Sequence, residues 1–472
     1  MSSAHRSSSP PRGLSFWILA AIISLSPLPF ASVGVIWTQL YGIAIGVALL
    51  AYVGERWRSA RAIPEIPGIL MLAAGLVALV ACWGYAQSIP GLFHSLQHPF
   101  WIQTAALLGQ PEMPGYLSLA PEQSVRIATR YLTYLGFAVL VIWHSRRQRN
   151  AELLLAIFIA VQAFYALYGL VIHFSGSATL LWFDHPSSGA VRSTFVNRNS
   201  YATYAGLGAL AASALVLGYL RRMVDDDKTH RTRLRELIET VTSYGWLLPL
   251  ALMVLFVALL LTQSRMGLLA VMAATLVLLA TWVVRLPRGS MRKLGTLLLL
   301  LLIGLVSVNF FLSGGATADR LARLFDDGDL RFEAYPLILD AIAERPWSGY
   351  GLGSFDTAFR AFRDESFPYL FSRAHSDYLE LAMDVGWPAA VAMVTAFVLL
   401  LMAAWRASRI RTQYELALLS VAATVQIGIH SAVDFGMQIP AVVYAYLLVA
   451  LVGIGQPQGE GGRPARTMPV ER

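Results

Sequence analysis

Apolar runs long enough to cross a lipid bilayer recur along the whole chain. A bilayer requires about 20 apolar residues for each helical span. Only 14% of the 472 residues are charged and 56% are hydrophobic, whereas about a quarter are charged in soluble domains. We therefore expect an all-α polytopic membrane protein with about 12 transmembrane helices. The twelve runs begin near Leu14, Val33, Ile66, Ser124, Ala151, Asn199, Tyr244, Arg265, Leu294, Asp377, Tyr414 and Met437.

The basic residues orient these spans. If the runs are connected in order, 24 of the 36 lysines and arginines fall on one side, together with both termini. The positive-inside rule makes that side cytoplasmic. The charge of +8 is thus distributed by topology rather than gathered in one patch, and we expect contact with membrane lipids and none with nucleic acid.

The remaining twelve basic residues are all arginines, and they lie in or beside a few outward segments. Topology does not require them there, so a role in substrate binding is one interpretation, and pairing with outward acidic residues is the other. The outward loop over residues 314–376 is far longer than ordinary connections. We expect spans 1–9 within 1–313, a helical lid within 314–376, spans 10–12 within 377–456 and a cytoplasmic tail over 457–472.

Two outward segments concentrate hydrogen-bond donors. Arg265 stands in a polar interruption between two spans, where an arginine costs several kcal/mol unless it finds a partner. The segment 192–200 combines Arg192 and Arg198 with Asn197 and Asn199. Guanidinium groups can hold a phosphate through two parallel hydrogen bonds. The alternatives are an interfacial ion pair for Arg265 and helix capping by an asparagine, with the arginines solvated.

His375 stands where the long loop re-enters the membrane, followed by Asp377 and Tyr378. An imidazole can take a proton from a hydroxyl, and Asp377 is close enough in sequence to orient it. The alternative is a histidine that is merely hydrogen-bonded. His430 and Asp434, four residues apart, form a weaker version of the same pattern, which we interpret as structural.

Other parts of the long loop carry weaker signals. Within residues 331–344, the spacing of Phe332, Tyr335, Leu339 and Ile342 predicts one apolar helical face. The glycine-rich segment 349–353 lacks the preceding strand of a phosphate-binding loop, so we interpret it as a turn.

Taken in order, the segments 192–199, 262–265, 331–355 and 375–379 resemble the O-antigen ligase family. This family contains O-antigen ligases, O-antigen and exopolysaccharide polymerases, and bacterial protein oligosaccharyltransferases. The sequence departs mildly from the family pattern at Tyr335, Ser376 and Asp384, where Trp, Asn and Glu are more usual.

The resemblance implies an inverting membrane glycosyltransferase of the bacterial inner membrane that needs no metal or other cofactor. It implies a glycan donor linked to undecaprenyl diphosphate, an acceptor that is lipid A core or a growing polysaccharide, and an active site on the periplasmic face. It makes His375, Arg265 and Arg192 the catalytic candidates. The second-tier candidates for substrate binding are Arg198, Asn199, Arg331, Arg373, Asp377 and Tyr378.

Two other functions remain open from the sequence. A transporter for polysaccharide or lipid-linked sugar would need polar residues through the depth of the membrane, whereas the outward arginines are confined to one face. A noncatalytic envelope scaffold would tolerate the loss of His375. We lean towards a ligase or polymerase over a protein glycosylase, because no extra C-terminal domain for a protein acceptor is present.

Overall fold

The structure, a computed structural model, describes residues 12–456 apart from 29, 178, 182, 185–188, 224–245, 313–329, 364–366, 368–370 and 412–413. The expected tail over 457–472 and the first part of the long loop lie outside the described residues. The amino-terminal helices are α1 (Leu14–Leu25), η1 (Phe30–Ser32), α2 (Val35–Arg58), α3 (Gly68–Gln87), η2 (His94–Leu96), α4 (Pro99–Leu107), α5 (Pro121–Ser145) and α6 (Gln148–Phe174). A short antiparallel pair follows, β1 (Thr179–Leu180) and β2 (Phe183–Asp184). The later helices are α7 (Arg198–Met223), α9 (Leu247–Leu261), α10 (Arg265–Arg285), α11 (Ser290–Leu312), α13 (Leu330–Glu344), α14 (Phe355–Phe359), α15 (Asp377–Ile410), α16 (Glu415–His430), η3 (Gly436–Gln438) and α17 (Pro440–Val452).

A described helix lies over each of the twelve apolar runs, so the expected helical membrane protein is confirmed at this coarser level. Among the described residues, seven helices are long and apolar enough to cross a membrane, namely α2, α3, α5, α6, α7, α10 and α15. The apolar helices α1, α9, α16 and α17 are shorter. The count of twelve spans and the side on which each loop lies stay predictions.

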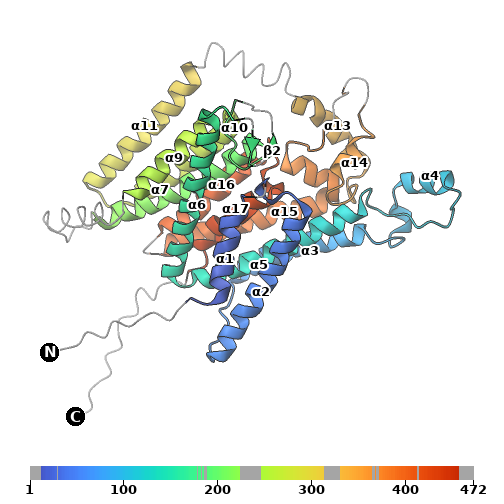
Figure 1. Ribbon diagram of the computed structural model, residues 1–472, viewed down its shortest axis with the longest axis horizontal. Helices are drawn as coiled ribbons and strands as arrows, with labels where there is room; N and C mark the ends of the chain where they lie inside the picture. Colours follow the sequence, from blue (N-terminus) through green and yellow to red (C-terminus); the bar gives the residue numbers. More distant parts are fainter. Residues whose placement is uncertain are drawn as a thin grey trace.

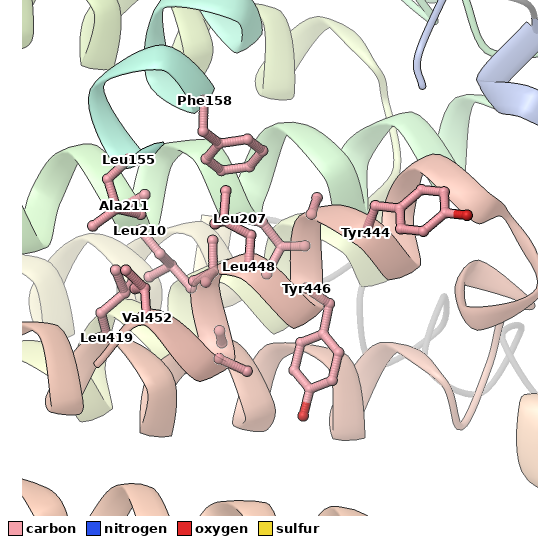
Figure 2. Packing of buried hydrophobic residues seen from close by; sticks show 14 of the residues in the cluster. Leu155, Phe158, Leu207, Leu210, Ala211, Leu419, Tyr444, Tyr446, Leu448 and Val452 are labelled. Carbon is pink, nitrogen blue, oxygen red and sulfur yellow. The ribbon is translucent and has the colours of Figure 1, made fainter. Parts of the chain in front are cut away.

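Helix α17 is at the centre of the bundle. Every residue of α17 except Leu447 is buried, and the helix packs against α5, α6, α7 and α16. Figure 2 shows Leu448 and Val452 of α17 among Leu207 of α7, Leu419 of α16 and Phe158 of α6. A helix that is apolar on all sides is typical of a protein core or of a membrane span, and α17 lies in the core of the bundle.

The long loop packs onto the bundle instead of forming a separate domain. Figure 1 shows α13 and α14 together at one end of the bundle, near the start of α15. Ala334, Ile338 and Ala341 of α13 share a buried cluster with Val80 of α3 and Met383 of α15. The buried face differs from the predicted one, because Leu339 is 49% exposed. We call the end of the bundle where α13 and α14 lie the site end.

The glycine-rich segment 349–353 is a turn, as predicted, and it packs against a break in α15. Gly386 interrupts α15 with a φ of 77°, and the N–H of Gly351 donates to the carbonyl of Asp384 at 2.8 Å. Gly349 has a φ of 63°, and a Cβ there would overlap the backbone of Asp384. Glycine is needed at such positions because it adopts positive φ and permits close backbone approach.

Gln87, the last residue of α3, ties this turn to the bundle. Its amide nitrogen donates to the carbonyls of Ser348 at 2.8 Å and Asp384 at 3.1 Å. Its amide oxygen accepts the N–H of Leu352 at 2.9 Å. A buried amide whose donors and acceptor are used in this way fixes the surrounding backbone, and the site end of α3 is thereby attached to both the turn and α15.

Candidate active site

The three motifs singled out in the sequence share an unusual backbone feature. Ser193, Gln263 and His375 have φ values of 52°, 54° and 50°. The left-handed region is uncommon for residues other than glycine, and such strained positions gather at functional sites. Each motif is thus held in a conformation that the surrounding structure must enforce.

The loop that carries Arg192 is hydrogen-bonded to the turn that carries Arg265. The N–H of Val191 donates to the carbonyl of Leu261 at 2.8 Å, and the side-chain amide of Gln263 donates to the carbonyl of Gly189 at 3.2 Å. These bonds bring the two predicted phosphate-binding segments together, although they are about seventy residues apart in the sequence.

The two arginines of these segments differ in exposure. Arg265 is exposed at the first position of α10, where the Ser264 hydroxyl caps the helix by accepting the N–H of Gly267 at 3.3 Å. Arg192 is half-buried, and burial lowers the pKa of its guanidinium. Arginine stays protonated in proteins, so both side chains supply positive charge at the site.

The segment after Arg192 begins helix α7. The side chain of Asn197 accepts the N–H of Asn199 at 2.8 Å, which is the capping role considered from the sequence. Arg198 is exposed at the first turn. One turn further along α7, the Thr203 hydroxyl lies 2.5 Å from Nδ1 of His430. The start of α7 therefore lies beside the end of α16.

His375 lies next to Asp434, which is 59 residues away in the sequence. Nδ1 of His375 is 3.4 Å from Oδ1 of Asp434. The Asp434 side chain is 1% exposed and that of His375 is 24% exposed. Both carboxylate oxygens of Asp434 are buried without a hydrogen bond among the described residues. A buried carboxylate without hydrogen bonds is costly, and the His375 imidazole is placed within ion-pair distance to compensate its charge.

The position of the His375 ring is fixed from several directions. Phe371 and Phe435 contact the ring, with centroid distances of 5.3 Å and 4.9 Å. The hydroxyl of Tyr335 on α13 donates to the carbonyl of His375 at 2.9 Å. Because this bond acts on a residue with positive φ, it stabilises a conformation that the backbone alone disfavours.

Asp377 is placed differently from our sequence expectation. Its Oδ2 accepts the Ser431 hydroxyl at 2.8 Å and the N–H of Met437 at 3.1 Å. Asp377 therefore organises the 431–437 segment, which contains Asp434, while Asp434 itself faces the histidine. Nδ1 of His430 lies against the Thr203 hydroxyl, and the charge of Asp434 also acts on the His430 ring. The histidine within ion-pair distance of Asp434 is His375.

Three further candidates surround the pair. Arg331 donates to the carbonyl of Val433 at 2.9 Å, next to Asp434. Arg373 forms an ion pair with Glu380 at 3.0 Å and also contacts the side chain of Gln438. The Tyr378 hydroxyl donates to the carbonyl of Gly428 at 2.8 Å.

Two residues of this region were missed by the sequence analysis. Asp434 was assigned to His430 because their spacing fits one helical face, and no sequence signal connects it to His375. Arg130 of α5 was counted only as an outward arginine, yet its Nη1 lies 3.4 Å from the carbonyl of Gln438. Among the described residues, no group of three or more His, Cys, Asp or Glu side chains is placed to hold a metal.

Part of the chain matches a known protein family. Residues 250–394 match the family described as O-antigen ligase, and no curated protein matches the chain. The match covers α9 to the first half of α15, including Arg265, Arg331, Arg373 and His375. The resemblance seen in the sequence is therefore confirmed, and it supports a multi-pass membrane protein of the glycosyltransferase type, a ligase or polymerase.

Proposed function

We propose, taking the O-antigen ligase match as the premise, that this chain moves a glycan from undecaprenyl diphosphate to an acceptor hydroxyl. The reaction takes place at the periplasmic face of the bacterial inner membrane, with both termini in the cytoplasm. The observation that carries the proposal is the His375–Asp434 pair, in which a buried carboxylate faces one ring nitrogen of a partly exposed histidine.

The pair has the arrangement of a general base. The Asp434 carboxylate lies 3.4 Å from Nδ1 of His375, and Nε2 on the other side of the ring is left to face the acceptor. When the acceptor hydroxyl attacks the anomeric carbon, Nε2 takes the hydroxyl proton, and the resulting imidazolium is stabilised by the Asp434 carboxylate. A buried carboxylate beside an imidazole serves the same two purposes in other enzymes, orientation and charge stabilisation.

The leaving group requires positive charge. As the bond from the anomeric carbon to the diphosphate oxygen breaks, the electron pair goes to the diphosphate, whose charge Arg192 and Arg265 stabilise. Positive groups placed where charge develops favour the transition state over the ground state. The new glycosidic bond forms on the opposite face of the sugar, so the configuration is inverted. The residues Arg198, Asn199, Arg331, Arg373, Asp377 and Tyr378 bind sugars or hold the loops.

The lining of the large cavity between α3, α5, α15, α16 and α17 argues against a transport function. At its end away from the site, the lining is formed by apolar side chains such as Ile66, Ile142 and Leu451. A path for a polar glycan would need hydrogen-bonding groups along its whole length. The charged residues that line this cavity are gathered at the site end.

The experiment that tests the function is a transfer reaction with protein purified in detergent. Undecaprenyl diphosphate-linked glycan is supplied with and without lipid A core, and the wild type is compared with His375→Ala. His94→Ala, in an exposed outward loop, is the matched control. A discrete product that requires lipid A core indicates a ligase, and a ladder made without it indicates a polymerase. Absence of transfer by the wild type, or full activity of His375→Ala, would contradict the proposal.

A further inference from the structure

A ring of five helices surrounds a cavity beside the candidate active site. Helix α3 packs on α5, α5 on α17, α17 on α16, α16 on α15, and α15 on α3. The cavity is partly open and has a volume of about 580 Å³, which is within the range of small-molecule sites. Arg192, Arg265 and His375 are not among its lining residues, so the cavity is distinct from the proposed diphosphate site.

The lining changes character from one end to the other. Away from the site it consists of hydrocarbon side chains, among them Ile66, Leu70, Ile142, Leu401 and Leu451. At the site end it includes Arg130, Arg373, Glu380 and Gln438. An apolar interior with a charged entrance matches a molecule with a hydrocarbon chain and a polar head group.

Arg130 is the charged group of this entrance that lacks compensation. Its side chain is 8% exposed, its Nη1 has one long hydrogen bond to the carbonyl of Gln438 at 3.4 Å, and its Nε has none. In the part of the chain that the structure describes, no carboxylate forms an ion pair with it. A buried guanidinium with open donors is costly and is suited to hold a phosphate.

Each of the other charged groups at this entrance has at least one partner, although Oδ1 of Asp384 is buried without a hydrogen bond among the described residues. Arg373 is paired with Glu380 at 3.0 Å. Asp384 accepts the N–H of Gly353 at 2.7 Å, and Asp377 accepts one hydroxyl and one N–H. The positive charge open to a ligand is therefore that of Arg130.

The entrance is connected through Gln438 to the segment that carries the proposed base. Gln438 contacts Arg130 through its backbone carbonyl and Arg373 through its side chain. Arg373 precedes His375 by two residues. A head group bound at Arg130 would therefore lie on the side of the cavity from which its sugars can extend towards the segment of the histidine.

We propose that this cavity binds an acyl chain of a phosphorylated acceptor lipid, whose phosphate is held by Arg130. This inference rests on the proposed function, in which the donor diphosphate occupies Arg192 and Arg265. Because Arg192 and Arg265 are assigned to the donor diphosphate, the phosphate held by Arg130 is assigned to the second substrate, the acceptor. The acceptor is then a membrane-anchored glycolipid, and neither a protein nor a second copy of the diphosphate-linked donor.

The first test removes the charge of Arg130. Arg130→Gln is compared with Arg126→Gln, one turn earlier on α5 and outside the cavity lining. We expect the KM for lipid A core to rise at least tenfold in Arg130→Gln, with the donor KM unchanged, and Arg130→Lys to fall between this variant and the wild type. A rise in the donor KM alone would assign the cavity to the donor chain and overturn the proposal.

The second test fills the cavity. Ala138→Phe reduces the volume from the α5 side. Leu132→Phe, at an exposed position of α5 outside the cavity lining, is the control. Each methylene group excluded weakens binding about fourfold, so we expect at least a tenfold rise in the KM for lipid A core and none for its deacylated form. An equal effect on both forms, or no effect on either, would refute a chain-binding cavity.

A binding measurement separates this inference from the proposed function. Lipid A is added to the full-length protein in detergent without donor, and the shift in melting temperature is recorded for the wild type and Ala138→Phe. The inference predicts a shift for the wild type that Ala138→Phe reduces, even if no glycan is transferred. Equal shifts in both proteins would contradict the cavity site, whereas a failure of the proposed function alone would leave this difference intact.

Discussion

Replacement of Asp434 by Asn removes the charge that faces His375 while keeping the size of the side chain. At the observed separation of 3.4 Å, a full negative charge stabilises the imidazolium by about 5 kcal/mol at an effective dielectric constant of 20. Because about a quarter of the His375 side chain is exposed, solvent weakens this interaction. The decrease in rate cannot exceed the contribution of general-base catalysis, so we expect a decrease of about 10²- to 10³-fold. We expect Asp434→Asn to lower kcat by that factor, with the donor KM changed by less than about threefold.

The assay is single-turnover transfer from lipid-linked donor, with Asp377→Asn as the matched control. Both hydrogen bonds of Asp377 go to one oxygen, Oδ2, so an asparagine oxygen can keep them. We therefore expect the control to retain most of its activity. If Asp377→Asn is the more damaging change and Asp434→Asn is active, Asp377 orients the histidine and the reasoning from the structure is refuted.

Three further predictions concern the surrounding groups. Arg265→Lys should lower kcat/KM for the donor at least tenfold, because an ammonium group cannot form the two parallel bonds of a guanidinium; near-normal turnover would remove it from the diphosphate site. Tyr335→Phe loses the bond to the His375 carbonyl, worth about 1 kcal/mol, so kcat should fall about fivefold and Tyr335→Trp should retain more activity; an unchanged kcat in Tyr335→Phe would show that the bond has no such role. Burial, and then the charge of Arg345, lowers the pKa of His98 to about 4, whereas the pKa in the unfolded chain is about 6.5. The unfolded chain therefore takes up the proton first, and the α4 segment should lose stability as the pH falls from about 6.5 towards 4. Hydrogen exchange of α4 measures this loss. His98→Asn should lack this pH dependence, and an identical dependence in the variant would assign it to another group.

The sequence was sufficient to predict the helices, because an apolar run in a membrane protein leaves few alternatives. A described helix begins within four residues of the start of each predicted run. The buried face of α13 was predicted less well. Ile342 is buried as predicted, whereas Leu339 is exposed and Ala334 and Ala341 are buried. Close packing against α15 accommodates these small side chains.

The site was predictable where its chemistry lies within one segment. The arginines and His375 stand in local motifs, and these could be identified from the residue types. The pairing of His375 with Asp434 depends on how the 431–437 segment folds back to the start of α15, which Asp377 fixes through hydrogen bonds to Ser431 and Met437. Contacts of this kind join distant segments, and no spacing rule predicts them. The cavity beside Arg130 is likewise a product of five helices packing together.

The measurement that tests the central claim most directly is chemical rescue of His375→Ala. Transfer from undecaprenyl diphosphate-linked glycan to acceptor is followed under single-turnover conditions, with and without added imidazole. If His375 is the base, the variant loses at least about 10²-fold in rate, and imidazole restores part of it in proportion to its concentration, but not in His375→Ala combined with Arg265→Ala. A His375→Ala protein that transfers glycan at the wild-type rate would contradict the account.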